Sequence, residues 1–199
     1  MLIDIVVFDG TDEMDALGPL EVLRSAAALG ASLEARLMTR EPQAQVRGAH
    51  GLRFLPDGQF APGRADIVIV TGGGWNIRAD RGAWGEVQRG QWLPLLAEAA
   101  ESSAVMAGVC TGTMMLAHAG VVGQRRAGTH HSAWSDLADT GATLVKDRVV
   151  DDGDLVTSGG VTSGIDLALW IVEREFSKEL ADRVADQMEY PYVRPTTVG

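Results

Sequence analysis

The stretch "AVMAGVCTGTMMLAHAG", residues 104–120, places the single cysteine of the 199-residue chain between an apolar run and a helix-like run. Gly108 and Gly112 flank Cys110 in a G-x-C-x-G pattern, the sulfur counterpart of the G-x-S-x-G turn that joins a strand to a helix. Glycines relieve crowding in so tight a turn and push the central side chain outward. The stretch therefore predicts a strand, a nucleophile elbow that presents Cys110, and a helix through about Gly120.

The same strand–helix alternation extends on both sides of the elbow. Apolar runs rich in β-branched residues occupy 2–8, 33–39, 65–71 and 103–109, each bounded by glycine or turn signals. Helix-like segments lie at 15–29 and 84–101. Strands that alternate with helical patterns predict a doubly wound α/β fold with a mostly parallel sheet.

The second half of the chain continues this pattern and shows no linker or internal repeat. We predict a short helix within 131–141, a hairpin in which "DDGD" joins 144–150 to 155–160, amphipathic helices within 160–176 and 177–188, and a tail over 189–199 with no fold of its own. In the first of these two helices Ile165, Leu169, Val172 and Phe176 share one face. We expect one domain over 1–199.

Composition excludes several classes of function. The formal net charge of −10 would repel a phosphate backbone, so we expect no nucleic-acid partner. The N-terminal "MLIDIVVFDG" is too short and too acidic for a signal peptide, and no stretch reaches membrane-spanning length. One cysteine cannot form an intrachain disulfide, which favours a reducing compartment. We therefore predict a cytoplasmic protein that acts on a small molecule, away from membranes.

Two loops that follow predicted strands carry the candidate chemistry around Cys110. A thiol at a helix N-terminus is expected to be exposed and to have a lowered pKa, although a lone cysteine can equally be a small buried hydrophobe. In "TGGGWN", residues 71–76, the amides of Gly72 and Gly73 could join the N–H of Thr111 in an oxyanion hole, or simply form a glycine-rich turn.

Two further loops and the histidines are also candidates for the site. Asp15, in "DEMDALGPLEV", could exchange protons with the thiol, or could belong to a helix start that favours acidic residues. The loop 157–166 is expected to be a plain strand-to-helix connection. His130 could line the pocket, but the "HH" pair has poor ligand spacing and no second cysteine is available, so we expect no metal and no other cofactor.

The elbow, the triple glycine and the "D-x-x-G-P" step that begins at Asp15 together resemble the ThiJ/PfpI superfamily, a class I glutamine amidotransferase-like group. The resemblance extends from the first strand to about Met188 and implies a flavodoxin-like three-layer α/β sandwich, in members that are commonly homodimers. Amidotransferase relatives carry a His-x-Glu pair, and none of the histidines here is followed two residues on by Glu. Protease-like relatives have a histidine directly after the nucleophile, where this chain has Thr111.

Asp15 together with Thr111 is most similar to the isocyanide hydratase branch, since the deglycase and stress-response branch has Glu at the first of these positions. That resemblance implies a cofactor-free lyase in which Cys110 attacks an isocyanide carbon to give a covalent thioimidate. Asp15 would handle protons, Thr111 would hydrogen-bond near the nucleophile, and amides around Gly72 and Gly73 would support negative charge. A thiol-sensing or ligand-binding protein and a glyoxalase or deglycase remain the alternatives.

Overall fold

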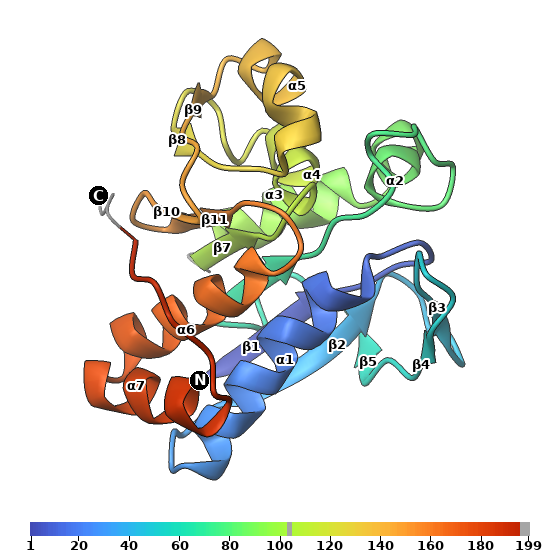
Figure 1. Cartoon of the computed structure of the whole chain (residues 1–199). Helices are drawn as coiled ribbons and strands as arrows, with labels where there is room; N and C mark the ends of the chain where they lie inside the picture. The colour runs from blue at the N-terminus through green and yellow to red at the C-terminus, as the bar shows by residue number, and fades with distance from the viewer. Residues whose placement is uncertain (103–104, 196–199) are drawn as a thin grey trace.

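A central β-sheet with helices on both faces makes up the protein (Figure 1). The computed structural model describes residues 1–102 and 105–195. The sheet runs in the order β10 (Val149–Asp151), β11 (Leu155–Ser158), β7 (Val105–Gly108), β6 (Ile67–Val70), β1 (Leu2–Val6), β2 (Glu34–Thr39) and β5 (Gly58–Gln59). Neighbouring strands are parallel except for β10 and β11, which form the predicted hairpin. The predicted α/β class is thus confirmed, while the first two residues of the strand expected over 103–109 lie outside the described residues.

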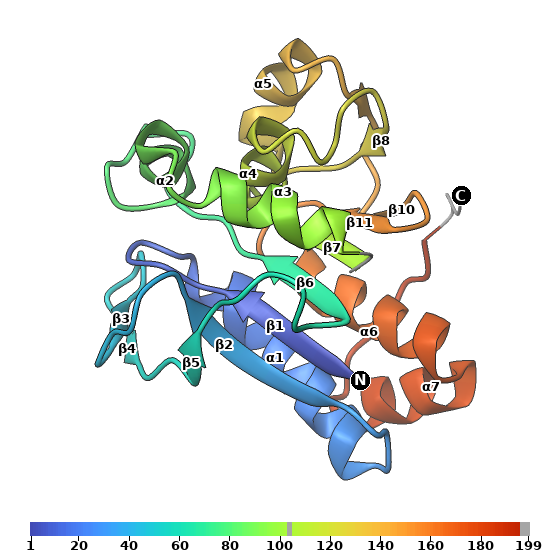
Figure 2. The same ribbon diagram turned by 180° about the vertical axis from the view of Figure 1, so that it is seen from behind.

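The helices divide between the two faces of the sheet, as the front and rear views show (Figures 1 and 2). One face is covered by α1 (Glu13–Ala28), α6 (Ser163–Glu175) and α7 (Lys178–Gln187), and the other by α3 (Leu93–Glu101) and α4 (Gly112–His118), with α2 (Ala83–Arg89) beside α4. A 3₁₀ turn, η1 (His131–Ala133), leads into α5 (Trp134–Asp139). Two small two-stranded sheets pair β3 (Val46–Arg47) with β4 (Arg53–Phe54) and β8 (Arg126–Ala127) with β9 (Thr143–Leu144). Across the described residues, no helix is both long and apolar enough to cross a membrane.

The segment 84–101, predicted as one helix, is two helices, α2 and α3. Gly90 ends α2 in the left-handed conformation with φ 67°, and its N–H caps the carbonyls of Glu86 and Val87 at 3.0 and 3.1 Å. Pro94 then lies in the first turn of α3, where its missing N–H costs no helical hydrogen bond. A left-handed glycine and a nearby proline together separate the two helices, and the apolar spacing alone does not reveal this break.

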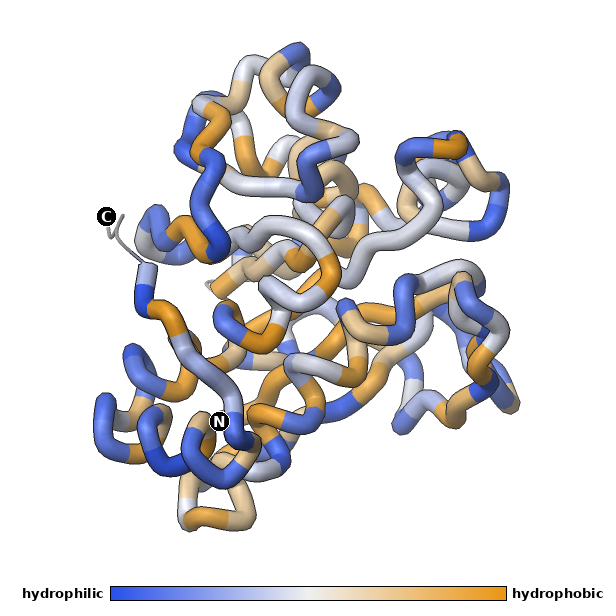
Figure 3. Tube along the Cα trace, viewed as in Figure 1, coloured by the Kyte–Doolittle hydropathy of each residue, from blue (hydrophilic) through white to orange (hydrophobic). Residues whose placement is uncertain are grey.

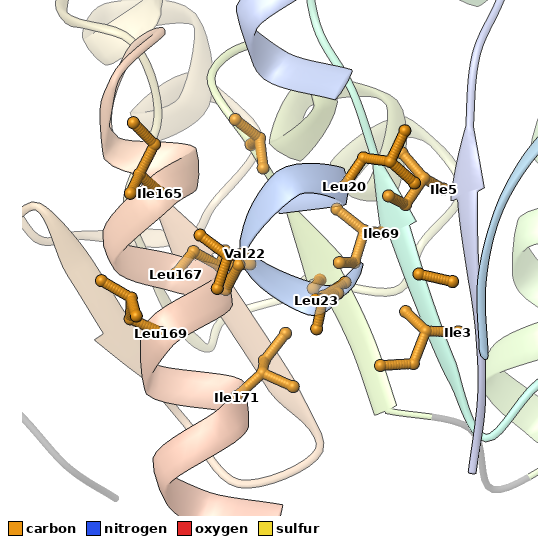
Figure 4. Packing of buried hydrophobic residues seen from close by; sticks show 14 of the residues in the cluster. Ile3, Ile5, Leu20, Val22, Leu23, Ile69, Ile165, Leu167, Leu169 and Ile171 are labelled. Carbon is orange, nitrogen blue, oxygen red and sulfur yellow. The ribbon is translucent and has the colours of Figure 1, made fainter. Parts of the chain in front are cut away.

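The core consists of two layers, one on each face of the sheet. In Figure 4, Leu20 and Leu23 of α1 lie against Ile3, Ile5 and Ile69 of the neighbouring strands, all of them buried. Figure 3 shows hydrophobic residues gathered along the central strands and the adjoining helices, with hydrophilic residues on the outer turns of α7.

The predicted face of α6 is present in this first layer. Ile165, Leu169 and Val172 are all buried in it, and only Phe176, which caps the helix, is part-exposed. Burial of this apolar face, rather than helix propensity, therefore holds α6 against the sheet.

The sheet order brings the four loops with candidate chemistry to one place. They follow β1, β6, β7 and β11, which are adjacent in the order β11-β7-β6-β1 and parallel to one another. Parallel neighbours end at the same edge of a sheet, and open α/β sheets bind ligands at that edge. The candidate site therefore lies where these four loops meet.

Candidate active site at the cysteine elbow

Cys110 occupies the predicted turn between β7 and α4, with its backbone in the left-handed region at φ 56°. A non-glycine residue with positive φ is strained and persists only where its surroundings fix it. Two hydrogen bonds do this: the Cys110 N–H donates to the Gly159 carbonyl at 3.0 Å, and the Thr129 hydroxyl donates to the Cys110 carbonyl at 2.8 Å. The elbow is thus held by the loop after β11 and by the segment after β8.

The two glycines of the G-x-C-x-G pattern are needed because the backbone around the elbow is tightly packed. A Cβ atom on Gly108 would lie 2.6 Å from the Thr113 hydroxyl oxygen. A Cβ atom on Gly112 would overlap the Val70 carbonyl oxygen of β6. The pattern read from the sequence therefore reflects a packing requirement of the turn.

Asp15 lies in the first turn of α1 and is completely buried beside the elbow. Its Oδ2 accepts the Gly72 N–H at 2.9 Å. Its Oδ1 is buried with no N–H or O–H donor in the described part of the chain. The neighbouring Cys110 thiol, whose hydrogen bonding lowers the pKa of Asp15, is the group that can share a proton with it. The structure thus brings together the two residues on which the sequence interpretation depends.

Burial dominates the acid–base behaviour of this pair. The Cys110 side chain faces the interior with only 5 % of the residue exposed, and desolvation raises its pKa well above the usual range, with the Asp15 charge adding to the rise. Desolvation likewise raises the pKa of Asp15, and the Asp12 charge adds to it. The expected exposed thiol with a lowered pKa is therefore wrong, because burial outweighs the helix terminus. Since both groups resist ionisation, the pair retains a proton near neutral pH.

The glycines after β6 orient the residues around the thiol. The Gly72 N–H is taken by Asp15, and the Gly73 N–H donates to the Thr111 hydroxyl oxygen at 3.0 Å. A Cβ atom on Gly72 would lie 2.5 Å from both the N and the Oγ1 of Thr111. In this structure both glycine amides thus have protein partners, and they fix the positions of Asp15 and Thr111.

The loop after β11, expected to be a plain connection, also contributes to the site. The backbone N–H groups of Val161 and Thr111 donate to the Cys110 sulfur and lower the pKa of the thiol. Val161 has φ 43°, a second strained non-glycine residue at the site. The glycine pair before Val161, together with the position of β11 next to β7, is the sequence signal that could have revealed this role.

A cavity of about 140 Å³ opens beside the thiol. Its lining includes Cys110 and Thr111 together with Asp12, Trp75, His130 and Val161. His130 is thus placed at the pocket, where its Nδ1 lies 2.8 Å from the Ser132 hydroxyl. Burial lowers the pKa of His130, which favours a neutral ring at physiological pH.

The other histidines, His50, His118 and His131, are not among the residues that line this cavity. His118 stacks on Trp75 with the ring centroids 5.9 Å apart, and the exposed His50 lies 3.5 Å from Asp12. Asp12, Glu13 and His50 bring potential metal-ligand atoms within 4.8 Å of one another. The Glu13 carboxylate, however, already accepts backbone N–H groups from the segment 50–52, so it serves to hold that loop.

The fold and the strand–cysteine–helix site together define an α/β protein with a nucleophile elbow at the carboxyl edge of a mostly parallel sheet. Residues 1–174 match the DJ-1/PfpI family, and the chain belongs to that family.

The chain is also similar to individual proteins in sequence and to solved structures in fold. Over 99 % of its length the chain is 32 % identical to a protein of Pseudomonas putida named isonitrile hydratase, covering 82 % of that protein. It is 27 % identical to the HTH-type transcriptional regulator CdhR of Pseudomonas aeruginosa, covering 96 % of this chain and 55 % of the regulator. A crystal structure of a ThiJ/PfpI family protein from Pseudomonas syringae superposes with a TM-score of 0.85 at 24 % identity, covering 100 % of this chain and 78 % of the other.

Proposed function

We propose that the protein hydrates isonitriles (isocyanides) to N-substituted formamides, with Cys110 as the nucleophile. The observation that carries the proposal is that the buried Cys110, which lines a small cavity, is hydrogen-bonded to the buried Asp15. The 32 % sequence identity to the Pseudomonas putida protein named isonitrile hydratase supports the same substrate class for this chain.

In the first step the Cys110 sulfur attacks the terminal carbon of the isonitrile and a C–S bond forms. The negative charge that develops on that carbon is neutralised by the proton that the pair holds, delivered from the buried Asp15. The product is a thioimidate, R–N=CH–S–Cys110, and Asp15 is left as a carboxylate. A single proton thus moves from the Cys110 thiol to Asp15, which generates the thiolate, and then from Asp15 to the substrate carbon, which completes the addition.

In the second step water adds to the thioimidate carbon. The Asp15 carboxylate takes one proton from the water and passes it to the substrate nitrogen, giving R–NH–CH(OH)–S–Cys110 and leaving Asp15 again as a carboxylate. Collapse of this adduct breaks the C–S bond, releases the formamide R–NH–CHO and returns the thiolate, while the hydroxyl proton restores the shared proton of the pair. The balance is one isonitrile and one water consumed for each formamide formed.

The remaining site residues position these groups. Thr111 presents its backbone N–H to the sulfur and can donate its hydroxyl to the substrate, since its Oγ1 is oriented by the Gly73 N–H. The N–H groups of Thr111 and Val161 donate to the reacting sulfur. Gly72 and Gly73 support the charge indirectly, because their amides hold Asp15 and Thr111 in place.

The test is steady-state formamide production from a panel of small aliphatic, alicyclic and aromatic isonitriles. We expect turnover by the wild type and loss by a factor on the order of 10³ or more in Cys110→Ala and Asp15→Asn. Asp4→Asn is the matched control, because Asp4 is an equally buried carboxylate whose hydrogen bonds come from Arg36 on β2 rather than from Cys110. If the wild type turns over no isonitrile, or if Cys110→Ala retains turnover, the proposal fails.

We extend the proposal to a homodimer in the cytoplasm. The large apolar side chains of Leu52 and Leu55 are 47 and 74 % exposed beside β4, and Met14 is 41 % exposed at the start of α1. Glu13 accepts the Leu52 N–H at 3.1 Å, which joins these two parts of the surface. Exposed apolar residues gathered in one region are typical of a contact surface. Light scattering on the purified protein should give the mass of a dimer, and Leu52→Asp should shift it to the monomer.

A further inference from the structure

We propose that Trp75 sets the size limit for the organic group of the substrate, and that Asp136 and Arg78 are positioning residues that hold its indole in place. The inference rests on the proposed function for the identity of the substrate. It concerns a wall of the cavity, however, which can be examined through the cysteine itself whatever the substrate is.

Trp75 forms one wall of the cavity that contains Cys110. It directly follows the triple glycine after β6 and is only 2 % exposed. Most of the other lining side chains are short or polar, such as Asp12, Asn76 and Ser132. Trp75 is therefore the largest residue in the lining of the cavity.

The indole is held at its edge by a charged partner. The Trp75 Nε1–H donates to Asp136 Oδ2 at 2.6 Å, and Arg78 Nη1 donates to the same oxygen at 2.8 Å. The hydrogen bonds from Arg78 and Trp75 lower the pKa of Asp136, so this carboxylate is ionised at neutral pH. Charge-assisted hydrogen bonds are about twice as strong as neutral ones, so the indole cannot swing away without losing a strong interaction.

The indole is also packed against neighbouring rings. Trp84 meets Trp75 edge to face with the centroids 5.1 Å apart, and His118 stacks on it at 5.9 Å. The Arg78 guanidinium lies 4.0 Å from the Trp84 ring centroid and 5.6 Å from that of Trp75. Arg78 therefore joins Asp136 to both rings, which makes the wall rigid.

The volume of the cavity limits the size of the organic group that can bind beside Trp75. The cavity measures about 140 Å³, and an apolar cavity of about 150 Å³ accommodates benzene, a molecule of about six non-hydrogen atoms. The isonitrile carbon and nitrogen use two of these atoms, which leaves room for about four in the organic group. Isopropyl isonitrile fits this limit, and cyclohexyl isonitrile exceeds it.

The first test compares kcat/KM for isopropyl and cyclohexyl isonitrile. We expect the wild type to prefer isopropyl by about tenfold or more, within the range that a hydrophobic pocket achieves. Trp75→Leu should shift the ratio at least about tenfold toward cyclohexyl, with Trp75→Phe as the smaller step should the leucine variant fold poorly. Trp134→Leu is the control, because the Trp134 indole donates to the Thr129 carbonyl and does not line this cavity.

A second test uses the cysteine alone and separates this inference from the proposed function. The chain has one cysteine, so each alkylation detected by intact mass reports Cys110. In this reaction the sulfur displaces iodide from an iodoacetamide and forms a thioether. We expect N-phenyl iodoacetamide to react at least about tenfold more slowly than iodoacetamide with the wild type, and Trp75→Leu to remove most of that difference.

The positioning role has its own readout. Asp136→Ala should relax the size discrimination as Trp75→Leu does, while Asp136→Asn should restore part of it because the amide oxygen can still accept the indole N–H. If discrimination is unchanged in both Trp75→Leu and Trp75→Phe, the inference is overturned. If the wild type turns over no isonitrile but the alkylation rates follow the predicted order, the proposed function fails and the size limit holds.

Discussion

Replacing Asp15 by Asn should stabilise the protein while abolishing turnover. The carboxyl group is fully buried, its Oδ2 accepts the Gly72 N–H at 2.9 Å, and burial raises its pKa. Asn keeps that acceptor, and its amide nitrogen can donate to the Cys110 sulfur in place of Oδ1. The substitution therefore removes an ionisable group from the interior without removing a hydrogen bond, and it leaves no carboxylate to take the thiol proton and deliver it to the substrate carbon.

The stabilisation should depend on pH with a definite sign. In the unfolded chain the Asp15 pKa is about 3.9, and a raised pKa in the folded state makes the wild type lose stability as pH rises between the two values. The advantage of Asp15→Asn should thus be small near pH 4 and should grow toward pH 8. We expect the substitution to raise the free energy of unfolding by about 1–2 kcal/mol, which raises Tm by roughly 2–8 °C in a domain of this size.

Calorimetric unfolding scans at a series of pH values measure this directly. Asp136→Asn is the matched control with the opposite sign, because hydrogen bonds from Arg78 and Trp75 lower the pKa of Asp136. That variant should lose stability at pH 8, and its deficit should shrink toward pH 3 as both states protonate. A Tm for Asp15→Asn equal to or below that of the wild type at pH 8, or a gain that does not change with pH, would refute the reasoning.

Three further substitutions test the packing around this site and the C-terminal segment, each by denaturant unfolding. Gly72→Ala should cost about 1–3 kcal/mol and lower turnover, because the added Cβ would lie 2.5 Å from Thr111 N and Oγ1; wild-type stability would show that the loop yields. Tyr190→Phe should cost about 1 kcal/mol, since the hydroxyl donates to Asp166 Oδ2 at 2.8 Å, and no loss would mean that water replaces the bond. Ser177→Ala should also cost about 1 kcal/mol by removing the side-chain cap of α7, and an unchanged midpoint would contradict that role.

The parts of the fold that the sequence predicted are those with a strong local signal. The runs at 2–8 and 65–71 are mostly apolar because these parallel strands are buried on both faces, whereas the run at 33–39 includes the exposed Glu34 and the half-buried Arg36. The elbow was predictable because close contacts leave no room for a Cβ atom at Gly108 and Gly112, so the turn requires glycine at both positions. The two-residue strands β3, β4, β5, β8 and β9 carry no periodic pattern, and only tertiary contacts define them.

The sequence singled out Cys110 and Asp15, which the structure brings together, but it did not reveal the electrostatics of the pair. Asp15 and Cys110 were singled out separately, and the sheet order, which the sequence does not state, brings their loops together. The elbow motif suggested an exposed thiol, whereas the thiol is buried beside Val161 and the buried Asp15 of α1. Burial is a property of the assembled loops, so the raised pKa of the pair could not follow from the motif alone.

The central claim is that the Cys110 sulfur forms a covalent bond with the isonitrile carbon. Rapid-quench intact mass spectrometry during turnover tests this, because the chain offers one thiol. The account predicts an adduct heavier than the free protein by the mass of one isonitrile, present in the wild type, absent in Cys110→Ala, and formed and consumed at rates that match turnover. Formamide production at the wild-type rate by Cys110→Ala, or turnover without any adduct on the pathway, would contradict it.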